Sequence, residues 1–430
     1  MKIIMAAFLL ALPSFAGPSG VQSFKLQNGL RVQLIENHQH PLVRLQLRAV
    51  WAPLETITPP PVVEPGGKAP IQRPKNQMAF EPLALGVLEK CSVGHRNRAA
   101  FNRAVEERGL SLRLSGDPDG PTWHLSGGSP EVESAFSLLA DASTRPIPEG
   151  GDLDAVKSRL IDELHESGMQ EGARINFLRL LIRPDLALEP ITESSLGQIY
   201  LVDIQRHITK TLRPGRAVLA ISGDLNLSQA RQLAQANFGT WNEGSEWSDK
   251  PADVVPRPTS STAEVLVRPP MIVPSERAET SIALPFHALD ERQRAAMELL
   301  SLWLPRGLGS ERCLIQFGAA QWRSLILTGD GSEASLREAL VAAKANGLKP
   351  SDLEQAKALW IAGRRALALH PQEQLSFASK ESLLGPEPSE QEIQSVDLAT
   401  FNATLQSWLN LNSARILILG GDQAPAPKAN

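Results

Sequence analysis

The stretch from Leu83 to Cys91 reads Leu-Ala-Leu-Gly-Val-Leu-Glu-Lys-Cys, and the rest of the chain can be organised around it. Together with the residues from Phe80 onward, its apolar side chains recur at helical spacing, which predicts a helix over residues 80–90. The preceding segment, residues 52–78, is dense in proline and includes Pro59-Pro60-Pro61. Such a composition predicts a polyproline or flexible loop that leads into this helix.

The length and composition place the chain among soluble, multidomain proteins. Its 430 residues exceed the usual limit of a single core, about 250–300 residues, so at least two domains are expected. Hydrophobic residues make up 42% and charged residues 21%, which is an ordinary globular balance. The net charge of −4 shows no basic excess, so we expect no nucleic acid partner.

The first residues have the pattern of a secretion signal. Lys2 supplies a positive start, the apolar run Ile3 to Leu12 is too short to span a bilayer, and Ser14-Phe15-Ala16 offers a cleavage site. Residues 1–16 are therefore predicted to be a signal peptide, and an uncleaved anchor is the alternative. No later stretch is apolar enough to cross a membrane, so we expect export to the periplasm without stable membrane insertion.

Alternating apolar residues and helical periodicity divide the next residues into short elements. Asn28-Gly29 favours a tight turn, and the alternation from Phe24 to Ile35 around it predicts a β-hairpin. The same reasoning predicts strands at 42–50, 110–115, 123–126 and 217–221, and helices at 98–108, 130–142, 152–168 and 227–238.

A weak internal repeat has an offset of about 200 residues. Asp152-Leu153 with Lys157 recurs as Asp352-Leu353 with Lys357, and the strand that ends at Asp224 recurs before Asp422. We also match Leu110–Asp117 to Trp322–Asp330, which implies that the second half has lost a hairpin.

The repeat predicts an α+β fold of two homologous halves, each an antiparallel or mixed sheet with helices packed on it. We expect domains at residues 21–240 and 262–423, a linker at 241–261 and a loose tail at 424–430.

Cysteine and histidine give few signals. Cys91 and Cys313 are far apart in the sequence, so both a disulfide and two buried free thiols remain open. His38 and His40 form a His-x-His pair with no acid or third histidine beside it. We interpret this pair as part of a solvated loop rather than a metal site.

With these pieces assembled, the chain from Phe24 to Asp422 resembles the insulinase-type, or pitrilysin-like, zinc metallopeptidase family. The resemblance rests on Leu-x-Asn-Gly-Leu-x-Val at Leu26–Val32, the helix at Leu83, Ser-Gly-Asp at Ser222–Asp224, and Gly-Leu-Gly-Ser-Glu-Arg at Gly307–Arg312. Family members are built from duplicated α+β halves that close like a clam around a peptide, so this chain is expected to form part of a chamber wall.

Active members of the family carry an inverted zinc motif, His-x-x-Glu-His, on a helix. The resemblance places this motif on Gly86 to Lys90. Gly86 and Lys90 stand at the two ligand positions, Glu89 matches the general base and Glu163 matches the distant third ligand. We therefore expect no bound zinc, no cofactor and no catalytic residue, with Glu89 and Glu163 as vestiges of the site.

Two alternatives concern these residues. Substitute ligands are available in the same half, namely Cys91, His95, His124 and His165. Lys90 is either paired with Glu163, and with Glu89, in place of the metal, or simply solvated.

The glycine-rich turn in the second half gives a further candidate site. Gly307, Gly309, Ser310 and Arg312 resemble a family turn that faces the chamber and helps to hold peptide. The alternative is a plain connection between two helices. A tyrosine that the family often has shortly after this turn is missing here.

Some members of this family work as pairs, in which a sister without the histidines completes the chamber of a zinc-bearing subunit. We therefore expect an exported, non-catalytic subunit that binds peptide as a heterodimer with a zinc-bearing peptidase subunit. The alternatives are a stand-alone peptide-binding scaffold of the envelope and a zinc metallopeptidase with substitute ligands.

Overall fold

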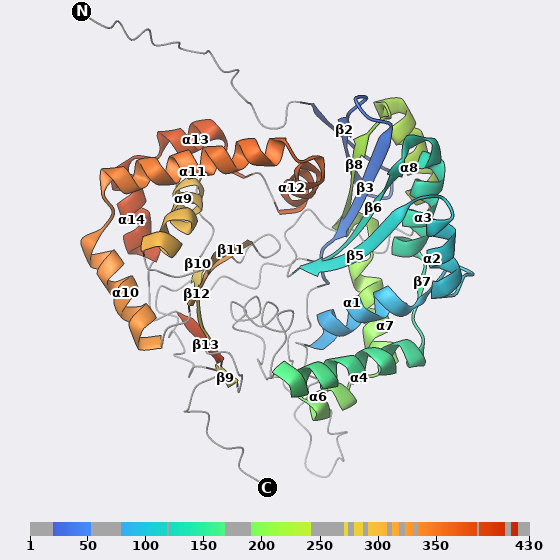
Figure 1. The fold of residues 1–430 in the computed structure, drawn as a ribbon, viewed down its shortest axis with the longest axis horizontal. Coiled ribbons are helices and arrows are strands. Elements are labelled where there is room, and N and C mark those ends of the chain that lie inside the picture. The colour runs from blue at the N-terminus through green and yellow to red at the C-terminus, as the bar shows by residue number, and fades with distance from the viewer. Residues whose placement is uncertain are drawn as a thin grey trace, which may run out of the picture.

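A computed structural model shows the fold (Figure 1). It describes residues 20–52, 79–117, 120–167, 191–241, 271–273, 279–286, 291–307, 312–317, 323–329, 333–384, 387–408 and 414–419. The predicted signal peptide and the predicted tail lie outside these residues. So does almost all of the predicted proline-rich loop and of the predicted linker.

The first half contains a six-stranded sheet with the order β1-β2-β8-β3-β6-β5. The strands are β1 (Val21–Lys25), β2 (Arg31–Glu36), β3 (Leu42–Ala49), β5 (Ser111–Asp117), β6 (Gly120–Gly128) and β8 (Ala217–Gly223). Strand β8 is inserted between β2 and β3, parallel to β2 and antiparallel to β3. A small second sheet pairs β4 (Ser92–Val93) with β7 (Pro146–Ile147).

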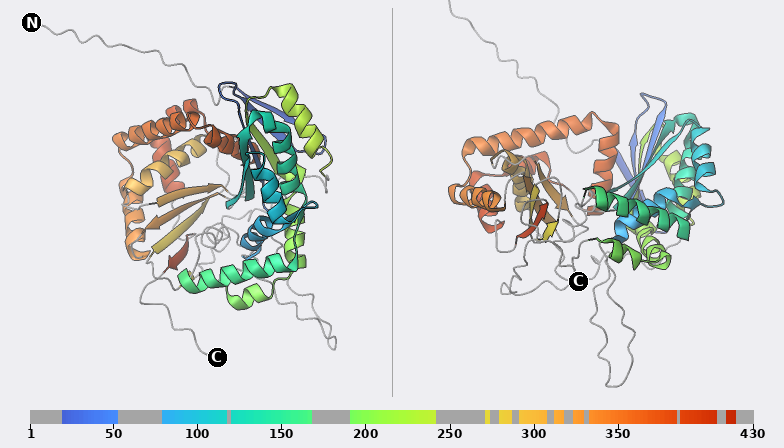
Figure 2. Two further views of the ribbon diagram at one scale, coloured as in Figure 1. Left: turned by 45° about the vertical axis from the view of Figure 1, so that its right-hand side comes forward. Right: turned by 60° about the horizontal axis from the view of Figure 1, so that its bottom comes forward.

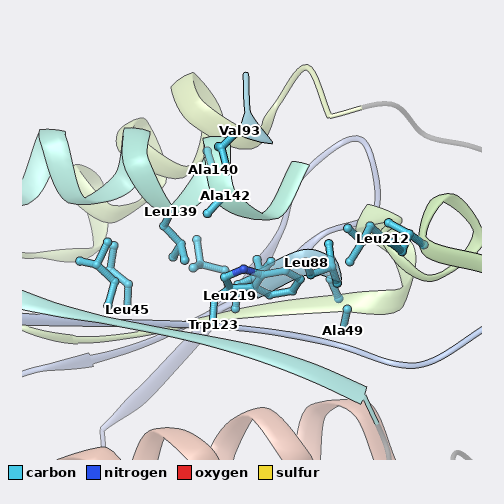
Figure 3. Packing of buried hydrophobic residues seen from close by; sticks show 14 of the residues in the cluster. Leu45, Ala49, Leu88, Val93, Trp123, Leu139, Ala140, Ala142, Leu212 and Leu219 are labelled. Atoms are coloured by element: carbon cyan, nitrogen blue, oxygen red, sulfur yellow. The ribbon is translucent and has the colours of Figure 1, made fainter. Parts of the chain in front are cut away.

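Helices cover one face of this sheet, as Figure 1 and Figure 2 show. The helices of this half are α1 (Phe80–Lys90), α2 (Arg98–Glu106), α3 (Val132–Thr144), α4 (Gly150–Ser167), α6 (Glu193–Gly197), α7 (Leu201–Thr211) and α8 (Leu227–Phe238). Helix α3 packs on β3 and β6, and α8 packs on β2. The core between the layers includes Leu45, Trp123 and Leu139, all nearly inaccessible to solvent (Figure 3).

The predicted hairpin at Asn28-Gly29 forms and also closes the first half. Gly29 has a φ of 91°, a conformation that glycine adopts without steric cost. The buried Asn28 amide donates hydrogen bonds to the carbonyl oxygens of Phe238, at 2.7 Å, and Trp241, at 3.1 Å. The beginning and the end of this half are therefore fastened together.

The second half repeats the sheet. Its five strands have the order β11-β12-β10-β13-β9. They are β9 (Met271–Val273), β10 (Glu279–Phe286), β11 (Arg312–Phe317), β12 (Arg323–Gly329) and β13 (Arg415–Leu419). Strand β13 is parallel to β9 and antiparallel to β10, as β8 is to β2 and β3. The two halves are thus homologous in topology, which confirms the α+β prediction.

The helices of the second half, with the exception of α12, pack around a separate apolar core. The helices of this half are α9 (Glu291–Gly307), α10 (Glu333–Asn346), α11 (Pro350–Ala368), α12 (Pro371–Leu384), α13 (Glu390–Ser395) and α14 (Leu398–Trp408). None of the helices in the described part of the chain has the length and apolar character of a membrane span.

The prediction of a lost hairpin is wrong. Strands β11 and β12 pair antiparallel, as β5 and β6 do in the first half. Strand β12 therefore corresponds to β6. The match of Trp322–Asp330 to Leu110–Asp117 is wrong by one strand, because residues 111–117 form β5. The described residues instead differ in helices: α9 alone lies between β10 and β11, where the first half has α1 and α2.

Helix α12 belongs to the second half but packs on the sheet of the first. It contacts β2, β3 and β8 on the face opposite the helices of the first half. Gln46 lies on this face, because side chains alternate along a strand and its neighbours Leu45 and Leu47 point into the core. Ser379 accepts a hydrogen bond from the Gln46 amide at 3.2 Å, and Ser376 donates one to the Gln46 amide oxygen at 3.1 Å. Figure 1 shows α12 beside this sheet.

Candidate functional site

Helix α1 carries the residues that match the zinc motif, and it is held firmly in the first half. Leu83 and Val87 are buried in the core, which explains the helical spacing of its apolar side chains. The helix ends at Cys91, where Arg98 donates hydrogen bonds to the carbonyl oxygens of Leu88, at 2.5 Å, and Cys91, at 3.0 Å. These bonds satisfy carbonyl groups that the last turn of a helix leaves without partners.

Gly86, at the first ligand position, faces helix α4. A Cβ atom added to Gly86 would lie 2.6 Å from Cγ1 of Val156 and 2.9 Å from Nη2 of Arg159. Both distances are shorter than ordinary van der Waals contacts. The space that a ligand side chain would need is therefore filled by two side chains of α4.

Arg159 connects the two carboxylates that the family resemblance assigns to the site. Its Nη1 atom lies 3.6 Å from Oε2 of Glu89, and its Nε atom lies 3.7 Å from Oε1 of Glu163. Glu163 stands one helical turn after Arg159 on α4, so the second pair follows from the helix geometry. A guanidinium thus neutralises the acids where the active family has a cation.

Lys90, at the second ligand position, does not take part in this bridge. Its side chain is exposed, and it forms no ion pair with any residue that the structure describes. Of the two alternatives for Lys90, the structure agrees with a solvated side chain.

The residues at this site do not fit a zinc ion. Zinc sites use three or four histidine, cysteine or carboxylate ligands, whereas here glycine and lysine stand at two ligand positions and Arg159 holds both acids. Within the described ranges, no group of three or more such side chains could hold a metal ion.

The proposed substitute ligands do not form a metal-binding group in the described part of the chain. Cys91 is a buried free thiol, and burial raises its pKa, which disfavours the thiolate that binds metals. The Nε2 atom of His124 lies 3.0 Å from the Ser115 hydroxyl, and that of His165 lies 3.9 Å from a carboxylate oxygen of Glu193. His95 is exposed in the turn after β4.

The glycine-rich turn lies between a helix and a strand. Gly307 is the last residue of α9 and Arg312 is the first residue of β11, so a connection between two helices is excluded. Gly309 and Ser310 lie outside the described residues. Peptide binding by Gly307, Gly309, Ser310 and Arg312 stays a prediction.

A second polar cluster was not foreseen. Nδ1 of the exposed His38 lies 2.8 Å from Oδ1 of Asp224, and its Nε2 lies 3.6 Å from Oε2 of Glu36. The Asp224 hydrogen bond raises the pKa of the imidazole. The prediction of a solvated loop is therefore correct for the exposure of His38. Of its two carboxylate partners, Glu36 is a neighbour in the sequence, whereas Asp224 is brought near by the parallel pairing of β2 and β8.

Sequence reasoning also missed Arg159. Its position four residues before Glu163 on a predicted helix was a usable signal for one of its two ion pairs. The contact with Glu89 depends on how α1 packs on α4, which no local pattern reports.

Comparison with known proteins bears on the family and the fold. A family model described as the Peptidase M16 inactive domain matches residues 200–316. A search of curated proteins gave no match.

Solved structures match almost the whole chain at low sequence identity. A protease from Helicobacter pylori is 13% identical with a TM-score of 0.69, and 93% of this chain covers 99% of that one. A peptidase M16 inactive domain from Pseudomonas fluorescens is 18% identical with a TM-score of 0.67, covering 95% and 100% of the two chains. The periplasmic protease PqqL from Escherichia coli is 13% identical with a TM-score of 0.62, and the match covers 93% of this chain but 47% of PqqL.

The solved structures show that the chain shares the α+β fold of these proteins. The family model adds that residues 200–316 are similar to the Peptidase M16 inactive domain, in agreement with the resemblance to the insulinase-type family. The expectation that it is not a working peptidase agrees with that match.

Proposed function

We propose that this protein is the non-catalytic subunit of an exported insulinase-type peptidase, which binds peptide and completes the chamber of a zinc-bearing partner. The observation that carries the proposal is the guanidinium of Arg159 between Glu89 and Glu163. Glycine and lysine stand at two of the ligand positions and an arginine pairs with the remaining acids, so this site has little affinity for a metal cation.

The length of the chain relative to PqqL supports a partner. The chain spans about half of PqqL, and it covers 92% of the structure of the first half of that periplasmic protease, with a TM-score of 0.61. A protein of this size that acts in a two-part enclosure would need a second, similar chain to supply the other part.

The first-half sheet supports peptide binding. Strand β5 is one of the two edge strands of this sheet, with β6 on one side and no strand on the other among the described residues. It lies beside α1, since the side chain of Leu85 approaches Gly116. An open strand edge offers backbone donors and acceptors to an extended peptide, which is a general mode of peptide recognition.

The test is co-purification. We would express the tagged chain together with an M16 relative from the same genome that has an intact His-x-x-Glu-His motif. We expect a one-to-one complex with zinc only in the partner, and peptide cleavage that requires both chains. A chain that stays alone and raises no activity in the partner would contradict the proposal, and peptide binding by the chain alone would then favour the stand-alone scaffold.

Metal analysis tests separately whether the altered zinc motif binds a metal ion. The purified chain should hold no stoichiometric divalent ion after exposure to zinc. A bound ion that is lost in the Glu89→Gln and Glu163→Gln variants would instead identify a peptidase with substitute ligands. Fractionation, with sequencing of the mature amino terminus, tests export and cleavage after Ala16.

A further inference from the structure

The face of the first-half sheet opposite its helices carries several arginines and, within its strands, a single acid at one end of β5. The register of the strands puts one set of side chains on this face, in the order of the sheet. They are Arg31, Gln33 and Ile35 on β2, Val218, Ala220 and Ser222 on β8, Arg44, Gln46 and Arg48 on β3, Thr122, His124 and Ser126 on β6, and Ser111, Arg113 and Ser115 on β5. The one acid at a strand position of this face is Asp117, the last residue of β5 and four residues after Arg113.

Helix α12 covers only one part of this face. It contacts β2, β3 and β8, and Gln46 beneath it is buried. Towards the β5 edge, Ser111, Arg113 and Ser126 are exposed. The part of the face next to the open edge is therefore accessible to solvent.

Two arginines in this region have no partner within the described part of the chain. Neither Arg44, which is half-buried, nor Arg113, which is exposed, forms an ion pair or a side-chain hydrogen bond there. Arg113 lies opposite His124, and Arg44 lies opposite Ser126. Strand spacings of about 4.8 Å and rises of about 3.4 Å per residue put their Cα atoms about 12 Å apart.

An extended peptide that adds to the β5 edge would present every second side chain to this face. A side chain of the peptide directly opposite Arg113 would have its Cβ atom about 5 Å away, where opposite charges attract across strands. Acidic side chains at alternate positions would then face Arg113, with Arg44 further in.

We propose that the peptide bound by this protein is acidic and extended, with carboxylate side chains at alternate positions that face Arg113 and Arg44. The inference rests on the proposed function, because it names the class of peptide for the same edge. Arg113 and Arg44 are specificity-determining residues in this assignment.

The experiment titrates the purified full chain with three blocked peptides of seven residues, the length of β5. They carry Glu, Gln or Lys at alternate positions and are otherwise identical. We expect the Glu peptide to bind about fivefold more tightly than the Gln peptide at low salt, with the Lys peptide weakest and the preference reduced at high salt.

The variants are Arg113→Gln and Arg44→Gln, with Arg103→Gln as the matched control. Arg103 is an exposed arginine of α2, in the helical layer on the other side of the sheet. Arg113→Gln should weaken binding of the Glu peptide about three- to fivefold, Arg44→Gln less, and Arg103→Gln not at all, with the Gln peptide unaffected throughout. Circular dichroism checks that each variant is folded.

The results separate this inference from the proposed function. Equal affinity for the Glu and Gln peptides, or a preference that survives in the double variant, overturns the acidic specificity and leaves peptide binding intact. No binding of any peptide overturns both the specificity and the peptide-binding role. Failure to co-purify with a zinc-bearing subunit, with the Glu preference retained, overturns the partnership alone.

Discussion

Two helix pairs occupy equivalent places in the two halves, and only one of them retains a polar site. Helix α1 packs on α4 in the first half, and α9 packs on α11 in the second. At the repeat offset of about 200 residues, Arg159 and Glu163 on α4 correspond to Leu359 and Gly363 on α11. Buried apolar positions specify the fold in both halves, whereas the charged bridge depends on particular side chains that only the first half has.

The largest effect that distinguishes the pairs is expected from Trp360, which corresponds to Leu160. Both side chains are exposed to 8%, but Trp360 is larger and lies under the guanidinium of Arg364, with 4.7 Å from Cζ to the ring centroid. Trp360→Ala should reduce the free energy of unfolding by about 3–5 kcal/mol and Leu160→Ala by about 2–4 kcal/mol. Urea unfolding followed by circular dichroism measures both free energies. A smaller loss for Trp360→Ala than for Leu160→Ala would mean that the two positions are not equivalent.

The next effect concerns the crowding of Gly86. Gly86→Ala should destabilise the protein by about 1–3 kcal/mol, because the new Cβ atom overlaps Val156 and Arg159. The matched control is Gly363→Ala in α11, where a Cβ atom meets nothing within 4 Å. That variant should be more stable by about 0.5–1 kcal/mol, since alanine favours a helix over glycine. Equal shifts for the two variants would mean that α1 does not pack closely on α4.

A smaller effect is expected from the charged bridge itself. The side chains of Arg159, Glu89 and Glu163 are 44%, 43% and 28% exposed, so solvent screens both ion pairs. Arg159→Gln should lower the free energy of unfolding by about 0.2–1 kcal/mol, and less in high salt. Lys90→Gln serves as the control and should change it little. A larger loss for Lys90→Gln than for Arg159→Gln would restore the rejected pairing of Lys90 with Glu163.

The smallest effect concerns the exposed pair His38 and Asp224, which follow β2 and β8. It is measured as a change in pKa. An NMR titration should find the pKa of His38 above the ordinary value of 6.5, because Asp224 accepts its hydrogen bond, and Asp224→Asn should lower it. The raised pKa of His38 means that its contribution to stability is present at pH values below 6.5 and is lost as the pH rises through that pKa. Asp224 has a lowered pKa, so its contribution is lost as the pH falls through that lowered value. A pKa for His38 that Asp224→Asn leaves unchanged would contradict this pairing.

Much of the first half could be predicted from local patterns. The helix over residues 80–90 has the bounds of α1, and the hairpin at Asn28-Gly29 forms as expected. These elements follow from apolar periodicity and turn chemistry, which act over a few neighbouring residues. The repeat was visible for the same reason, since Leu153 and Leu353 are both buried near the start of corresponding helices.

The rest required contacts between residues far apart in the sequence. The hairpin of the second half was misassigned because one alternating strand is much like another, and only strand pairing shows that β12 corresponds to β6. The motif positions could be found from the family resemblance, but the bridging cation could not. Which residue supplies that cation depends on how α4 packs against Gly86, because the lack of a side chain on Gly86 leaves room for Arg159.

The place of β8 in its sheet has a consequence for biosynthesis. A ribosome releases β2 and β3 early, yet the strand that must lie between them is residues 217–223, which emerge only after most of that half has been made. Until then the nascent chain holds two incompletely paired strands with open backbone edges, which are templates for incorrect association. A chaperone that binds the unfolded chain should therefore matter most until residues 217–223 are available for pairing, whether folding begins at the ribosome or after export.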